Sequence, residues 1–240
     1  MDRQTRKDLK TDKFAEEVID VFEWTSLHKL QVVRYGAVAV ALILIAVGVT
    51  YYNRSQAVVR QEALAKALRF DDATTGPNVQ PTNLHYDTEA EKSAAKVKAF
   101  TELSAKYSGT QEGAIADMYL ASYAMDQGQQ DEAATRYKRV VADGPKPYAA
   151  LARLSLSQIY LSEGKTADAE KVLRDAIANP AVTVSKEHAT LALGELLAKT
   201  NPTEARKLLE PLRTSSRGTI SRTAIADLGN LGPAAATAPK

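Results

Sequence analysis

The sequence contains no cysteine, only three histidines and no large excess of charge of either sign. Without cysteine, disulfide bonds, thiol catalysis and cysteine-ligated metals are excluded. His28, His85 and His188 are far apart, and none stands at metal-binding spacing from another. The net charge of +2 provides no strongly basic face, which argues against a nucleic acid as the partner.

Glycine-rich loops are also missing, because the glycines stand alone. The sequence has no GxGxxG or Walker-type motif that could hold a phosphate. Ser155, Ser157 and Ser162 belong to one helical pattern and have no histidine and acid arranged beside them. Asp71-Asp72 resembles a weak cation site, but the pair fits better as the end of a helix. We therefore expect a protein that is not an enzyme and needs no cofactor or metal.

One uncharged apolar run, residues 35–52 (YGAVAVALILIAVGVTYY), is the most informative feature of the chain. Eighteen helical residues at about 1.5 Å each are about 27 Å long, close to the thickness of a bilayer's hydrocarbon core. A buried core helix of this length would normally show a polar face. A cleaved signal peptide would have a short basic leader and small residues at its cleavage site. We predict a single transmembrane helix at 35–52.

The flanking charges give only a weak signal for the orientation of this helix. Lys29 and Arg34 precede the apolar run closely, whereas more basic residues, from Arg54 to Arg69, follow it. Counted over its whole length, however, the leader at 1–34 is rich in lysine and arginine, and long domains cross membranes largely regardless of charge. We predict a single-pass protein with its N-terminus on the cytoplasmic side and the rest of the chain on the other. A repeat domain on the cytoplasmic side remains the alternative.

The leader itself has apolar residues at helical spacing, at Phe14, Val18, Val21 and Phe22. With Trp24 close to the membrane, this pattern indicates an amphipathic helix lying on the membrane surface. A docking helix for a partner protein is the alternative interpretation.

After the apolar run, the sequence repeats with a period of 36 residues. A small residue recurs in each unit, and a large residue follows it four positions later. These positions are Ala133, Ala169 and Ala205, with Tyr137, Leu173 and Leu209. Gly128 and Gly164 stand where a first helix should end, and Asp131 and Thr166 are candidate caps of the second. Helical pairs at a fixed period predict an all-α solenoid of about three to four pairs.

These positions resemble the tetratricopeptide repeat. The matching residues of the two clearest units are Leu120, Ala121, Gly128, Ala133, Tyr137 and Pro145, then Leu156, Tyr160, Gly164, Ala169, Leu173 and Ala176. The third unit is weaker, because Thr200-Asn201 replaces the turn glycine. The resemblance implies a protein-binding fold and carries almost no information about the ligand.

The repeat domain is predicted to span 53–231. Within it, residues 70–91 contain Gly76, Pro77 and Pro81 without periodicity, which favours an exposed flexible loop. Residues 216–231 are expected to form a capping helix. The last residues, 232–240, have the composition of a disordered tail.

In tetratricopeptide arrays, the first helix of each pair lines a concave groove, and this resemblance suggests a binding surface here. The lining residues would be Met118, Ser122, Met125, Leu154, Gln158, Leu161, Thr190, Gly194 and Leu197. Such an apolar surface suits loosely specified hydrophobic peptide segments. The alternative is that about half of these side chains pack against the next repeat or the capping helix.

The order of one anchor, the helix around residues 59–68 and then tetratricopeptide pairs is similar to a bacterial inner-membrane family that accompanies the Sec translocon. This resemblance implies a periplasmic accessory factor or chaperone, with translocon subunits, partner chaperones or unfolded client segments as its binding partners. The long leader, 1–34, departs from that family's pattern. A structural scaffold in envelope assembly or division, recognising a folded partner, is the alternative function.

Overall fold

The computed structural model describes residues 29–77 and 84–231. The predicted amphipathic helix of the leader and the predicted tail at 232–240 lie outside the described residues. The chain divides into two compact units, Met1–Val59 and Arg60–Lys240, which are treated separately below.

The described part of the first unit is helical and belongs to α2 (Lys29–Leu68). Its apolar side chains are exposed, including Leu44 at 66% and Val47 at 59%. The hydroxyl of Thr50 donates to the carbonyl oxygens of Ala46 and Val47, so this polar group is satisfied within the helix. By length and composition α2 could cross a membrane, although a signal sequence near an N-terminus has the same properties. The helix includes the predicted span at 35–52 and starts before it.

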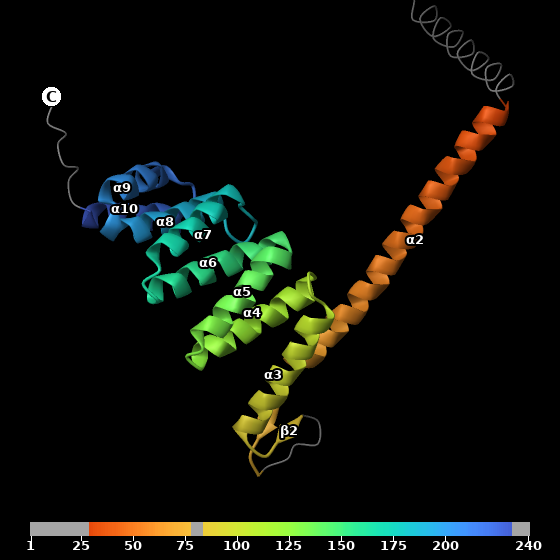
Figure 1. The fold of residues 1–240 in the computed structure, drawn as a ribbon, viewed down its shortest axis with the longest axis horizontal. Coiled ribbons are helices and arrows are strands. Elements are labelled where there is room, and N and C mark those ends of the chain that lie inside the picture. The colour runs from red at the N-terminus through yellow and green to blue at the C-terminus, as the bar shows by residue number, and fades with distance from the viewer. Residues whose placement is uncertain (1–28, 78–83, 232–240) are drawn as a thin grey trace, which may run out of the picture. The chain divides into compact units, whose positions relative to one another are not determined.

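The second unit consists of the end of α2, a small strand pair and a series of helices. The elements after α2 are β1 (Thr74–Thr75), β2 (His85–Tyr86), α3 (Glu89–Lys106), α4 (Gln111–Asp126), α5 (Gln130–Asp143), α6 (Lys146–Ser162), α7 (Thr166–Ala178), α8 (Lys186–Thr200), α9 (Pro202–Leu209), the 3₁₀ helix η1 (Glu210–Thr214) and α10 (Gly218–Asn230). From α3 onward, consecutive helices pack beside one another as a solenoid (Figure 1). The described residues thus confirm the predicted all-α repeat architecture, including a last helix at α10.

The turns within two helix pairs depend on glycine. Gly128 and Gly164 adopt φ angles of 72° and 73°, in the left-handed region that glycine enters without strain. The turn between α8 and α9 is built differently. It consists of Asn201 alone, whose side chain accepts a hydrogen bond from the backbone N–H of Glu204 and caps α9.

The predicted caps at Asp131 and Thr166 are wrong. The N-cap residues of α5 and α7 are Gln129 and Lys165, and neither makes a side-chain capping hydrogen bond. Both helices begin earlier than expected, so Asp131 and Thr166 lie inside their first turns. Asp131 still places a negative charge near the positive end of α5.

The repeated small and large residues form the core. Ala133, Ala169 and Ala205 are all completely buried, and Leu173 and Leu209 are nearly so. Alanine at these positions lets neighbouring helices approach closely, while the larger residue four positions later fills the space beside it.

The interval 70–91, expected as a flexible loop, contains regular structure. Strands β1 and β2 pair in parallel, with Thr74 opposite His85, and α3 begins at Glu89. The ammonium group of Lys92, on α3, donates to the carbonyl oxygen of Ala73 at 2.7 Å. This part of the interval is therefore fastened to the repeat domain.

Candidate protein-binding groove

A groove with a volume of about 530 Å³ lies between α6 and α8, above α7, and we call it the α6–α8 groove. Its lining residues are Leu154, Ser157, Gln158, Leu161, Thr166, Leu173, His188, Leu191, Ala192, Glu195, Leu196, Lys199 and Thr200. Six of these thirteen residues are apolar, five of them leucine, and the other seven are polar. Leucine side chains beside hydrogen-bonding groups suit the binding of a peptide segment.

Three predicted groove residues, Leu154, Gln158 and Leu161, line the groove from α6. Leu161 is 41% exposed, so its side chain is accessible to a bound segment. Gln158 is exposed beside it and can offer its amide to the backbone of a bound segment.

The predicted residues of α8 do not line the groove. Leu197 is 3% exposed and packs in a core cluster with Ala169 and Leu173. Thr190 is half-buried and donates its hydroxyl to the carbonyl oxygen of Lys186 in its own helix. Gly194 is buried against Leu209 of α9.

The groove residues of α8 that sequence reasoning missed stand two positions further along. Ala192, Leu196 and Lys199 take the places that the 36-residue period assigned to 190, 194 and 197. The physical cause is the turn before α9. It has one residue, Asn201, whereas the turn before α7 has three. The 36-residue period that relates α7 to α9 therefore does not relate α6 to α8. The sequence did contain a signal for this shift, because the missing turn glycine before α9 indicates a turn of different length.

The predicted residues of α4 lie elsewhere. Met118 and Met125 are half-buried and pack against the core cluster around Ala121 and Tyr137, while Ser122 is exposed. None of the three lines the α6–α8 groove. Of the surface predicted as one continuous groove, the α6 residues line the α6–α8 groove. The α4 residues lie outside it, on a separate face.

One carboxyl group, that of Glu195, lines the groove, and the carboxyl group of Asp227 on α10 lies near enough to act on it. Burial raises the pKa of the Glu195 carboxyl, and the charge of Asp227 on α10 raises this pKa further. Burial also raises the pKa of Asp227. Within the described part of the chain, the Oδ2 atom of Asp227 is buried without a hydrogen-bond partner. An ionised pair here is thus poorly stabilised.

The described residues offer no cluster of three or more histidine, aspartate or glutamate side chains that could hold a metal ion. The lining residues of the groove offer apolar contact through leucine side chains and hydrogen bonding through Gln158 and its neighbours.

Comparisons with known proteins give the family of the chain. No curated protein and no solved structure matches it significantly. A family model described as a tetratricopeptide repeat-like domain matches residues 31–207, which is most of the sequence and includes both sides of the groove. Proteins with such repeats generally act as protein–protein interaction modules. This chain belongs to the tetratricopeptide repeat-like domain family.

Proposed function

We propose that this protein is a membrane-anchored binding module whose α6–α8 groove holds apolar segments of other proteins. The observation that carries the proposal is the row of leucines in the groove, in which Leu154, Leu161 and Leu191 surround an open cavity. Burying one leucine side chain of a ligand contributes about 1.5–3 kcal/mol. Two or three such contacts favour weak, broadly specific binding.

The more specific proposal is a periplasmic accessory factor or chaperone at the Sec translocon. It is supported by the apolar run that precedes the repeats and by the order of anchor, helix and repeat pairs. An anchor would hold the groove close to emerging chains, and tethering raises the effective concentration of a weak site to about the millimolar range. Client segments, partner chaperones and translocon subunits are the proposed partners.

Binding of an unfolded, leucine-rich client peptide to the full-length protein in nanodiscs tests the groove. We expect Leu161→Glu to weaken binding about tenfold, because it places a charge among the apolar contacts. Ile225→Glu is the matched control, since Ile225 is a similarly exposed aliphatic residue on α10 that does not line the groove. Equal affinities of the two variants would refute the assignment of the groove.

A second candidate function, a structural scaffold for a folded partner, is favoured by Val182. This residue lies between α7 and α8, is 92% exposed and does not line the groove. Pro147 and Lys186 lie in the same surface depression. Val182 lines this depression together with Pro147, Pro180 and Ala181, and a contiguous apolar patch with a polar rim is a feature of protein-docking surfaces.

A further inference from the structure

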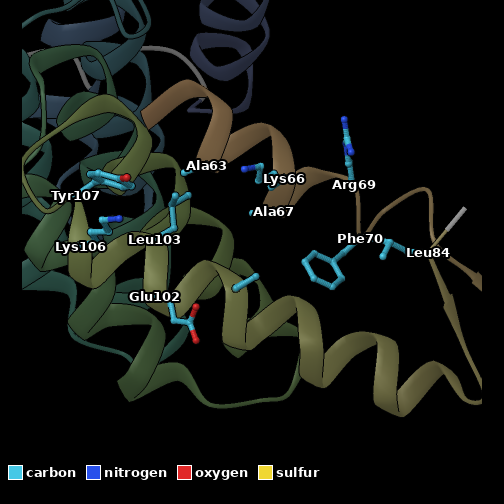
Figure 2. A pocket seen from close by; sticks show the side chains of 11 residues that line it. Ala63, Lys66, Ala67, Arg69, Phe70, Leu84, Glu102, Leu103, Lys106 and Tyr107 are labelled. Carbon is cyan, nitrogen blue, oxygen red and sulfur yellow. The ribbon is translucent and has the colours of Figure 1, made fainter. Parts of the chain in front are cut away.

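A second cavity, of about 570 Å³, lies near the start of the repeat domain, and we call it the α2–α3 pocket. It is separate from the α6–α8 groove. Its lining residues are Ala63, Lys66, Ala67, Arg69, Phe70, Leu84, Ala99, Glu102, Leu103, Lys106 and Tyr107. They come from the last turns of α2, from α3 and from the segment that joins them. Figure 2 shows the ring of Phe70 projecting into the space between α2 and α3.

The pocket stays open because the helices that face it carry small residues. Ala63 and Ala67 on α2 and Ala99 on α3 line it and cannot span the gap. The large ring of α3, Phe100, is completely buried and stacks on Tyr119 of α4 at 4.1 Å between ring centroids. The large aromatic side chain of α3 therefore packs against α4. The side of α3 that faces the pocket has smaller apolar residues, which form the floor of the pocket.

The rim of the pocket is basic. Lys66, Arg69 and Lys106 are exposed there, against a single acid, Glu102. None of these three cations forms an ion pair with a carboxylate among the described residues, whereas nearby Arg60 pairs with Glu112 and Lys96 pairs with Asp71. Lys106 lies near the ring of Tyr107, at 5.3 Å from its centroid. The rim thus presents positive charge that the described residues leave unneutralised.

We propose that the α2–α3 pocket docks an acidic amphipathic helix of a partner protein. The apolar floor between two helices matches the apolar face of a third helix, with anchors at positions i, i+3, i+4 and i+7. Cations from both flanking helices match carboxylates on either side of that face. A lipid headgroup would satisfy the cations but would leave the apolar side chains of Phe70 and Leu84 in contact with water. The proposal does not depend on the function of the α6–α8 groove.

The position of the pocket along the chain gives it a role. Ten residues separate the end of the apolar run at Tyr52 from Ala63. With α2 as the membrane anchor of the proposed function, on which this role rests, a helix docked here would be tethered to the apolar run by these ten residues. The pocket would recruit a stable partner, and the groove would bind transient clients.

Synthetic helical peptides test the docking site on the full-length protein in phosphatidylcholine nanodiscs. One peptide carries leucines at i, i+3, i+4 and i+7 flanked by glutamates, and the other has lysine in place of each glutamate. We expect the acidic peptide to bind at least about tenfold more tightly, with an affinity that falls as salt is added. Equal binding of the two peptides would overturn the proposal.

Charge reversal locates the binding. The double variant Lys66→Glu/Lys106→Glu should weaken binding of the acidic peptide about tenfold or more. The control, Lys171→Glu/Lys207→Glu, changes the net charge equally at exposed positions on α7 and α9. Equal losses of affinity in the two double variants would show that the acidic peptide is attracted non-specifically by charge. That result would overturn the assignment of the α2–α3 pocket as the docking site. Leu161→Glu should leave binding of this peptide unchanged, which separates the result from that of the groove.

A photoreactive residue at Leu84, which lines the pocket and is 44% exposed, distinguishes a protein from a lipid occupant. In nanodiscs that also contain phosphatidylglycerol, we expect it to crosslink to the acidic peptide. Crosslinking to lipid that the peptide does not displace would overturn the proposal.

Discussion

Gly194 of α8 lies directly against Leu209 of α9, and a β-carbon added at Gly194 would stand 2.6 Å from the Cδ2 atom of Leu209. This close approach belongs to the same helix pair whose turn contains only Asn201. The short turn and the glycine together set the register of α8, which in turn directs Leu191, Glu195 and Leu196 into the groove.

The first prediction concerns this contact. Gly194→Ala should destabilise the protein by about 1–3 kcal/mol, because Leu209 is completely buried and must shift. Gly229→Ala is the matched control on α10, where an added β-carbon meets nothing within 4 Å. It should be neutral or stabilise by up to about 1 kcal/mol, since alanine favours helix. Urea unfolding measures both, and a smaller loss at Gly194 than at Gly229 would contradict the close packing.

The second prediction concerns Asp117, a buried acid of α4 that joins three helices. Its Oδ1 atom accepts hydrogen bonds from Ser104 Oγ at 2.7 Å and from Arg139 Nη2 at 2.5 Å. Asp117→Ala should cost about 2–4 kcal/mol, because it leaves polar partners unpaired. Glu210→Gln, in an exposed pair with Arg213, should cost under about 1 kcal/mol. Comparable losses in thermal or urea unfolding would argue against a structural role for Asp117.

The third prediction concerns pH. The pKa values of Glu195 and Asp227 are raised in the folded protein by burial, and in Glu195 also by the charge of Asp227. A raised carboxyl pKa stabilises the fold below the unfolded-state pKa, and this contribution is lost as pH rises through the folded pKa. Glu195→Gln should therefore gain stability relative to the parent protein as the pH rises above about 4, the ordinary pKa of a glutamate carboxyl. A constant difference between the two unfolding curves across that range would contradict the raised pKa.

The fourth prediction concerns topology. If the repeat domain is periplasmic, a protease added to spheroplasts should digest it, while a cytoplasmic marker protein stays intact. Protection of the domain until the membrane is permeabilised would place it in the cytoplasm and would exclude a role for the groove in exported chains.

The sequence predicts the helices well because their cores repeat. Ala133, Ala169 and Ala205 are conspicuous in the sequence, and so are the turn glycines at Gly128 and Gly164. The face of α8 is harder to predict, since its register depends on a turn of one residue instead of three. The 36-residue period holds for α5, α7 and α9. Applied to α8, it places the predicted groove face two residues too early in the sequence.

The other features were hidden for a different reason. The pairing of β1 with β2 involves only two residues on each strand, too few to show a pattern. The α2–α3 pocket arises from alanines such as Ala63 and Ala67, which also occur throughout the tightly packed pairs. Only the arrangement in space distinguishes an alanine that permits close packing from one that leaves a gap.

Site-specific photo-crosslinking in intact membranes tests the central claim, that the α6–α8 groove binds apolar segments of exported proteins. The photoreactive residue replaces Gln158, which is exposed in the groove, or Val182, which lies outside it. We predict that position 158 crosslinks to nascent secretory chains and that position 182 does so much less. Crosslinks to one folded partner from position 182, with no client crosslinked at position 158, would contradict the claim and favour the scaffold.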